Sequence, residues 1–248
     1  VSAQCNTTFA NIEGIHGTAG ADSLTGGDPA HAVDAQGNSI SERFRGNAGN
    51  DTITGGTGNG FFTIADYANN SSVQAINVNL GTGTANDGLG GTDTLVNVDT
   101  VRGGAGADTL TGGSLERSSN GMFFEVFRGN AGNDTINGAN ASSDGPDASS
   151  DRADYSNNTS TQAINVNMAS GTVTDGLGGT DTLVDVDQVY GGAGNDTFLG
   201  SSGNDVFEGG FGNDTIDGAG GADEVRYMTS FARVIVNLSG NSIAVGGT

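Results

Sequence analysis

The sequence predicts an all-β solenoid, a fold in which short strands stack coil upon coil. Three observations support this prediction: a nine-residue repeat, a longer repeat of about 87 residues, and an unusual composition. The 248 residues include 45 Gly, 2 Pro and no Trp, and 34% of them are hydrophobic. That content suits the thin core of a repeat architecture better than the core of a compact globular domain.

The nine-residue repeat is clearest between residues 191 and 226. This stretch divides into the lines GGAGNDTFL, GSSGNDVFE, GGFGNDTID and GAGGADEVR. Each line has Gly at positions 1 and 4, Asp at position 6 and an apolar residue at position 8. Gly favours the tight turn of the first six residues because it adopts positive φ without a Cβ clash. Residues 7 to 9 are then expected to form a short strand whose position 8 faces the core.

These lines match the pattern GGxGxDxUx, and the chain thereby resembles the RTX, or hemolysin-type calcium-binding, repeat family. The resemblance implies a parallel β-roll or β-helix in which two lines make one coil and loops two lines apart stack. It also implies several Ca²⁺ ions, each bound by carboxylates and loop carbonyls of neighbouring coils, since calcium takes six to eight oxygen ligands. The ligand pairs would include Asp196 with Asp214 and Asp205 with Asp223. The expected loop glycines are Gly192, Gly194, Gly203, Gly210, Gly212 and Gly221.

Stacked carboxylates make the ions structural rather than optional. Neighbouring strands lie about 4.8 Å apart, and two unit charges at that distance repel by roughly 3 kcal/mol at an effective dielectric constant of ~20. A thin core offers little to offset this repulsion, so folding is expected to be coupled to calcium binding. Without calcium, a Gly-, Asn- and Asp-rich segment of this kind is expected to be disordered.

The longer repeat divides the chain into modules. Asn11–Gly27 returns as Asn97–Gly113, and Asp185–Gly200 follows in the same register. We therefore expect one continuous solenoid of three modules. Their bounds are 1–96, incomplete at its N-terminal end, 97–184, and 185–248, which holds the four tandem lines (within 185–226) and a terminal strand.

Isolated nonapeptides recur inside the modules. Each has an acid at position 6, and two interpretations remain open: the acid binds metal, or it caps its turn through side-chain-to-backbone hydrogen bonds. The acids are Asp22, Asp51, Asp93, Asp108, Asp134 and Asp181.

Other segments differ from the nonapeptide pattern. Gln74–Leu80 and Gln162–Met168 alternate apolar and Asn residues, which predicts strands with one buried face. Asp28–Arg43, Ser114–Val126 and Ala139–Arg152 lack the motif and are expected to be irregular loops inserted in the solenoid.

Charge and apolar patterning exclude several classes of protein. The formal net charge is −21, which excludes a binder of nucleic-acid phosphates. No apolar run approaches the ~18 residues of a membrane span. Cys5 is the only cysteine, so an intrachain disulfide is ruled out, and an intermolecular bond or a buried thiol remains. Calcium loops of extracellular type bind at roughly 10⁻⁴ to 10⁻³ M, so a secreted or cell-surface location is expected, by type I-like secretion given the family resemblance.

No catalytic constellation is evident. His16 and His31 are the only histidines, and neither is spaced with a Ser or Cys nucleophile. We therefore expect a non-enzymatic, extracellular structural protein: a filament, surface-layer or adhesin-type solenoid. The alternative is the C-terminal calcium-binding module of a type I-secreted protease, lipase or epimerase. An ice-binding solenoid would need a Thr row on every coil, whereas Thr82–Thr84 and Thr172–Thr174 provide one pair per module.

The chain ends suggest self-association. Asn237–Thr248 stops near the point of the repeat at which Thr8–Ile15 resumes, so copies are expected to stack head to tail. Equally, the sequence is consistent with a segment of a longer repeat protein. Cell-surface or matrix components are the other expected partners.

Overall fold

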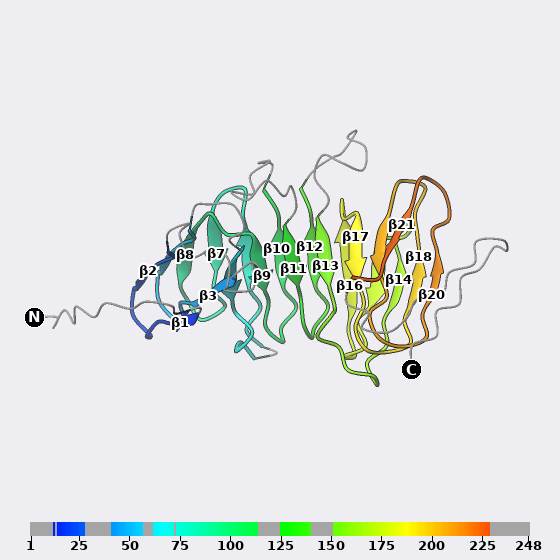
Figure 1. Cartoon of the computed structure of the whole chain (residues 1–248). Helices are drawn as coiled ribbons and strands as arrows, with labels where there is room; N and C mark the ends of the chain where they lie inside the picture. The colour runs from blue at the N-terminus through cyan, green and yellow to red at the C-terminus, as the bar shows by residue number, and fades with distance from the viewer. Residues whose placement is uncertain are drawn as a thin grey trace, which may run out of the picture.

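The computed structural model describes residues 12, 14–27, 41–56, 62–71, 73–113, 125–139 and 151–228. In these residues the fold is all-β, with short strands stacked into an elongated parallel solenoid (Figure 1). The predicted fold class is therefore confirmed. The C-terminal boundaries of all three predicted loops were wrong: Ser41–Arg43, Val126 and Arg152 belong to strands because they continue the parallel ladder. Cys5, His31, the terminal strand and most of the three predicted loops lie outside the described residues.

One side of the solenoid is a sheet of nine parallel strands. Each strand pairs with the strands of the preceding and following coils. Its members are, in spatial order, β1 (Gly14–His16), β3 (Ser41–Arg45), β5 (Phe62–Asp66), β9 (Thr100–Arg102), β11 (Val126–Arg128), β13 (Arg152–Asp154), β17 (Gln188–Tyr190), β19 (Val206–Glu208) and β21 (Glu224–Arg226).

The other side is a sheet of twelve strands, parallel apart from two. The exceptions are β7 and β15, which pair antiparallel with both of their neighbours. The members are, in spatial order, β2 (Ser23–Thr25), β4 (Thr52–Thr54), β8 (Thr92–Val96), β7 (Thr84–Asn86), β6 (Asn77–Asn79), β10 (Thr109–Thr111), β12 (Thr135–Asn137), β16 (Thr180–Val184), β15 (Thr172–Thr174), β14 (Asn165–Asn167), β18 (Thr197–Leu199) and β20 (Thr215–Asp217).

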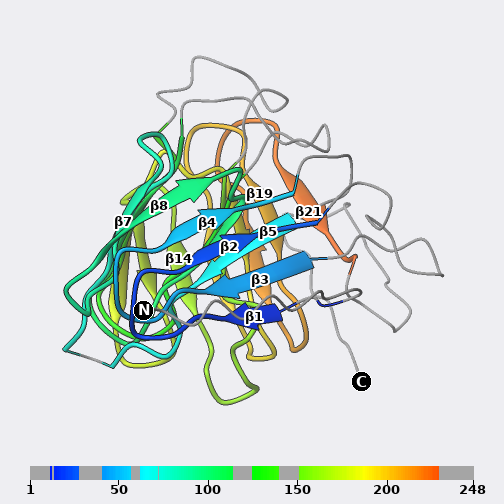
Figure 2. The same ribbon diagram turned by 90° about the vertical axis from the view of Figure 1, so that its left-hand side faces the viewer.

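Coils of two kinds follow one another along the axis in a repeating order. A short coil passes once through each sheet, for example β3 then β4. A long coil passes once through the nine-stranded sheet and three times through the other, as in β5 followed by β6, β7 and β8. Two short coils precede each long coil. Viewed along the solenoid, the coils overlie one another, with β7 and β8 on one side and β1 and β3 on the other (Figure 2).

The core is thin because most strands contribute one inward side chain. The fully buried side chains with the largest volume are Phe127, Phe198 and Phe207. Phe198 and Phe207 face each other across the core with ring centroids 5.4 Å apart. In the long coils the inward residue of the nine-stranded sheet is Ala65 or Ala153. Stability must therefore depend heavily on the ladders and loops that join the coils.

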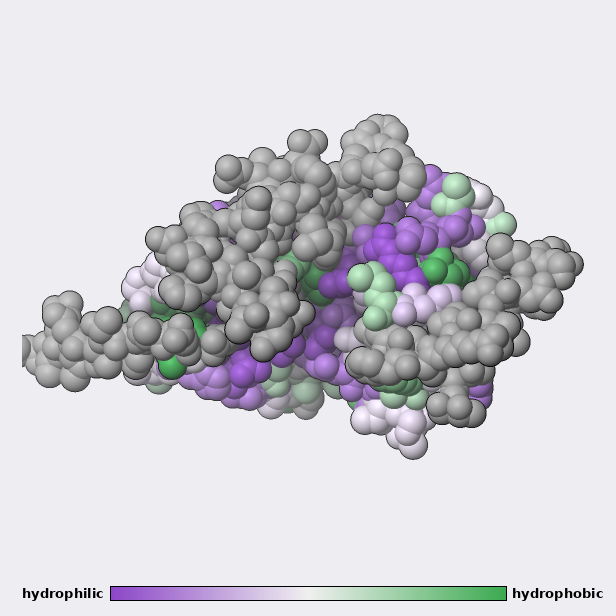
Figure 3. All heavy atoms as spheres, in the orientation of Figure 1, coloured by the Kyte–Doolittle hydropathy of each residue, from purple (hydrophilic) through white to green (hydrophobic). Residues whose placement is uncertain are grey.

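The outer face of the nine-stranded sheet holds the described basic side chains. Strand register places Arg45, Asp66, Arg102, Arg128 and Asp154 in successive positions along one line. Arg45 Nη2 lies 2.7 Å from Asp66 Oδ2, and Arg128 Nη2 lies 2.7 Å from Asp154 Oδ2. Where coloured atoms are visible on this face, the surface is largely hydrophilic (Figure 3). The arginines thus compensate acids of this face, away from the loops.

Candidate metal sites

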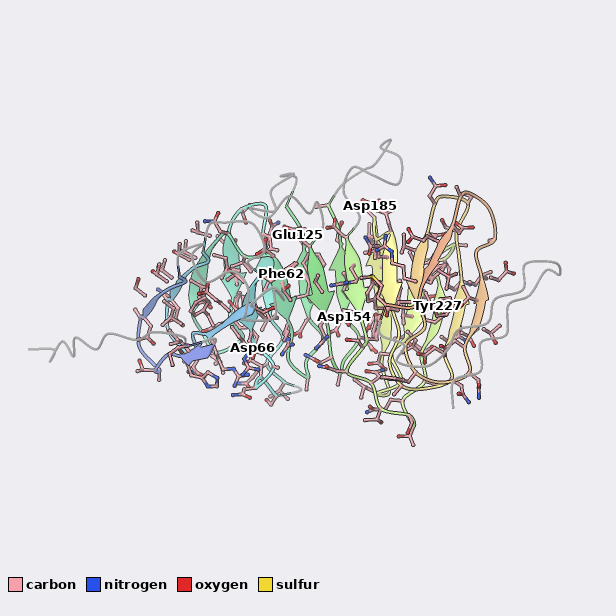
Figure 4. All side chains as sticks on the ribbon, in the orientation of Figure 1. Phe62, Asp66, Glu125, Asp154, Asp185 and Tyr227 are labelled. Carbon is pink, nitrogen blue, oxygen red and sulfur yellow. The ribbon has the colours of Figure 1, made fainter. Side chains whose placement is uncertain are left out.

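The loops that join the two sheets gather on two edges of the solenoid. Loops on the first edge run from the nine-stranded to the twelve-stranded sheet, and loops on the second edge return. Figure 4 shows Glu125 and Asp185 near the second edge, whereas Asp66 and Asp154 lie at the opposite ends of the strands.

On the first edge, the position-6 acids of neighbouring coils stack. Asp51 Oδ1 accepts a hydrogen bond of 2.8 Å from the backbone amide of Asp22, and Asp93 Oδ1 accepts one of 2.9 Å from that of Asp51. The same bonds recur from Asp108 to Asp134 (2.8 Å), from Asp134 to Asp181 (2.9 Å) and from Asp196 to Asp214 (3.0 Å). The isolated nonapeptides therefore repeat the stacking of the tandem run on the same edge, in groups separated by the long coils, where the amides of Ile76 and Ile164 donate to the next acid instead.

The second oxygen of these carboxylates has a partner in some loops and none in others. The position-2 amide of Gly104 donates to Asp108 Oδ2 over 2.7 Å, and that of Gly192 donates to Asp196 Oδ2 over 3.0 Å. In the loops of Asp51 and Asp134, position 2 is an Asn with φ of 71° or 70°, and the carboxylate Oδ2 is buried without a hydrogen-bond partner. In these two loops, a residue with positive φ at position 2 thus accompanies a position-6 carboxylate whose Oδ2 accepts no hydrogen bond.

Two position-6 acids have side-chain partners of another kind. Tyr67 donates from its hydroxyl to Asp93 Oδ2 over 2.9 Å, and Tyr155 donates to Asp181 Oδ2 over 2.8 Å. Both tyrosines are buried in the core. Because both oxygens of Asp93 and Asp181 accept hydrogen bonds from the protein, the geometry favours the hydrogen-bonding interpretation for these two acids.

The six glycines of the tandem run that the sequence predicts as loop residues lie in stacked pairs. A Cβ on Gly210 would lie 2.1 Å from the carbonyl oxygen of Gly192. A Cβ on Gly212 would lie 1.9 Å from that of Gly194, and one on Gly221 would lie 2.0 Å from that of Gly203. The φ angles of Gly210, Gly212 and Gly221 are 88°, 124° and 123°. Only Gly therefore permits the close approach that points the carbonyls of one coil at the next.

A second column of acids lies on the second edge, and most of it was missed in the sequence. Asp205 N donates to Asp223 Oδ1 over 3.1 Å, as the repeat predicts. The register of the nine-stranded sheet continues this column through earlier coils, interrupted by Thr63. The additional acids are Glu42, Asp99, Glu125, Asp151 and Asp187. Each precedes an inward apolar residue by two positions, which is the D-x-U spacing of the nonapeptide, and that spacing was the available signal.

Burial makes the anionic form unfavourable for several acids of the two edges. Burial raises the pKa of Asp134 and that of Glu125 to about 8. The pKa values of further acids are raised to about 6, again chiefly by burial: Asp93, Asp99, Asp108, Asp181, Asp187 and Asp196. All six described arginines lie in strands of the nine-stranded sheet, so no arginine occurs among the described loop residues.

A family model for the RTX calcium-binding nonapeptide repeat matches the chain in four copies, over residues 15–28, 36–60, 97–114, 121–141 and 187–225. The chain contains RTX calcium-binding nonapeptide repeats. A search of curated proteins gives no significant match. The matched residues include the short-coil loops of both edges, whereas the long-coil hairpins lie outside them.

Calcium fits the oxygen atoms that the RTX loops provide. Buried carboxylate oxygens without a partner occur at Asp51, Asp87, Asp134 and Asp175, and stacked loop carbonyls lie beside the carboxylates. In the described part of the chain, no three acidic, His or Cys side chains form a metal cluster on their own. Bound calcium would therefore need carbonyl ligands as well as carboxylates, which is the mixture that this ion accepts.

Proposed function

We propose that this calcium-binding β-roll is an extracellular structural protein, a filament, surface-layer or adhesin-type solenoid that calcium folds and stiffens. The observation that supports this most directly is the pair of acidic columns on the two edges. Buried carboxylates that repel one another along the whole axis require counterions at regular intervals. Calcium at those positions would join each coil to the next.

The proposed ligands are the position-6 acids and the loop carbonyls of the tandem run, together with those of the short coils. Asp196 with Asp214, and Asp205 with Asp223, are the pairs that stack within the run. Because extracellular calcium modules bind at roughly 10⁻⁴ to 10⁻³ M, such sites would fill outside the cell. The described residues include no helix of the length and apolarity that a membrane span requires.

Head-to-tail stacking is part of the proposal. Within the described residues, β1 and β2 are the last strands at one end of the sheets, and β21 and β20 are the last strands at the other end. Each of these four strands pairs with a neighbouring described strand on one side only. An open sheet edge is a template for pairing with another chain, and unlike ends that meet produce an open, heterologous contact. Stacked copies would continue both acidic columns from one subunit to the next.

Assembly can be measured by light scattering and electron microscopy of the chain in millimolar calcium. We expect concentration-dependent, elongated particles that dissociate in EGTA. Magnesium at equal ionic strength is the control, because it screens charge but prefers rigid octahedral sites that retain water. A strictly monomeric particle in calcium would contradict stacking and would favour the alternative, a calcium-binding module of a type I-secreted enzyme.

A further inference from the structure

Each long coil ends in a hairpin whose turn contains a buried carboxylate that the repeat pattern does not include. Asp87 lies between β7 and β8, and Asp175 lies between β15 and β16; both are fully buried. Asp87 Oδ1 accepts hydrogen bonds from the backbone amides of Leu89 (2.7 Å) and Gly91 (2.8 Å). Asp175 Oδ1 accepts the equivalent bonds from Leu177 and Gly179, both of 2.8 Å. One oxygen of each carboxylate therefore fixes the turn.

The other oxygen of each carboxylate, Oδ2, accepts no hydrogen bond and lies near a carbonyl oxygen of the preceding coil. Asp87 Oδ2 is buried and unpartnered. A Cβ placed on Gly91 would lie 2.6 Å from that oxygen and 1.8 Å from the carbonyl oxygen of Gly49, in the loop of the preceding coil. Both oxygens thus lie close to the same point beside Gly91, and two hydrogen-bond acceptors placed near each other away from water are costly unless a donor or a cation lies between them.

A second unpartnered carboxylate belongs to the same junction. Asp51 ends the loop that contains Gly49, and its Oδ2 is also buried without a donor. The charge on Asp87 is one of the causes that raise the pKa of Asp51, so the two acids interact electrostatically. No arginine lies in either the loop or the hairpin turn.

The second module repeats the junction with the same local sequence: residues 129–136 match residues 46–53, and residues 175–183 match residues 87–95. A Cβ on Gly179 would lie 2.8 Å from Asp175 Oδ2 and 1.7 Å from the carbonyl oxygen of Gly132. The Oδ2 atoms of Asp134 and Asp175 are both buried and unpartnered, and the charge on Asp175 contributes to the raised pKa of Asp134. The same unsatisfied arrangement, with two buried and unpartnered carboxylate oxygens, thus recurs in both modules and is consistent with a ligand-binding geometry.

We propose that each junction binds a calcium ion between the short-coil loop and the hairpin turn. The ligands in the first module are the carboxylates of Asp51 and Asp87 and the carbonyl oxygen of Gly49, and those in the second are Asp134, Asp175 and Gly132. The inference rests on the calcium dependence proposed above and adds sites that the tandem nonapeptides lack. A bound cation would fasten each hairpin to the coil before it.

The test is the number of ions bound by the full chain, measured by equilibrium dialysis with calcium, for the parent and for Asp87→Asn/Asp175→Asn. Asn keeps the Oδ1 acceptor of the turn and removes the charge, so we expect two fewer ions per chain. In EGTA at pH 5, where we expect the fold to persist, the same variant should unfold at a higher temperature than the parent, because its amide can donate to the nearby carbonyl. Asp185→Asn/Asp217→Asn is the control: it removes two charges from exposed positions and should retain every ion.

The outcomes separate this inference from the proposed function. A parent chain that binds no calcium would overturn both. A parent that binds calcium, with an unchanged ion count and affinity in Asp87→Asn/Asp175→Asn, would overturn the junction sites alone.

Discussion

Without calcium, the protein should be more stable at pH 5 than at pH 8. Burial raises the pKa of Asp134 and of Glu125 to about 8, whereas such carboxyls titrate near 4 in an unfolded chain. Between these values the folded state binds more protons than the unfolded state, so stability falls as the pH rises. The protonated groups contribute fully below about pH 4, and their contribution is lost as the pH rises through about 8.

The size of the effect follows from the pKa differences. A difference of one pKa unit between the folded and unfolded states corresponds to about 1.4 kcal/mol. One such unit at each of the two carboxyls therefore changes the free energy of unfolding by about 3 kcal/mol. For a chain of this length, that difference shifts the melting temperature by roughly 6 °C or more. Far-ultraviolet circular dichroism in EGTA measures the difference: the β signal should persist to a higher temperature at pH 5 than at pH 8, where we expect it to be lost even without heating.

Two controls accompany this experiment. In millimolar calcium the dependence should flatten or reverse, because the cation replaces the protons between the carboxylates. Asp134→Asn, which does not titrate, should show a smaller difference between the two pH values than the parent. A calcium-free parent that melts at a higher temperature at pH 8 than at pH 5 would show that the buried acids are stabilised as anions by the protein itself.

Gly91→Ala should destabilise the calcium-loaded protein by about 3 kcal/mol, the upper part of the usual range for overpacking. The new methyl group would lie 1.8 Å from the carbonyl oxygen of Gly49, so the hairpin turn and the short-coil loop would have to move apart. Chemical denaturation in calcium measures the loss. Because backbone lies on both sides of the contact, rotation of a side chain cannot relieve it.

Gly20→Ala is the matched control for that substitution. Gly20 also lies in a first-edge loop, but its added Cβ would meet only the hydroxyl of Thr18, at 3.7 Å. The stability should therefore change by no more than about 0.5 kcal/mol. Equal stabilities of Gly91→Ala and the parent would indicate that the coils are not in the close contact described above.

The strict period of the nonapeptides made the stacking of the tandem run predictable. The resemblance to RTX repeats implies that two lines fill one coil, so Asp196 and Asp214 were expected to meet on one edge, and the structure brings them together. The inward position 8 followed from strand alternation, and Phe198 and Phe207 are buried as expected. The strand within Gln74–Leu80 was also predicted, and the structure has it as β6.

The hairpins and the second acidic column were not predicted, for two different reasons. Thr84–Asn86 is a three-residue strand, too short for alternation to reveal, and its antiparallel pairing depends on contacts between three passes of the same coil. The acids of the second edge are separated by insertions of unequal length, which hide their common register in the sequence. Asp87 was overlooked because it lies one residue before a nonapeptide and outside its pattern.

The coupling of folding to calcium is tested most directly by far-ultraviolet circular dichroism of the chain at pH 8 before and after exhaustive dialysis against EGTA. We expect the β signal to be lost on dialysis and to return when calcium, but not magnesium, is added back. A β signal that persists unchanged without calcium would contradict the claim that cations between the acidic columns hold the coils together.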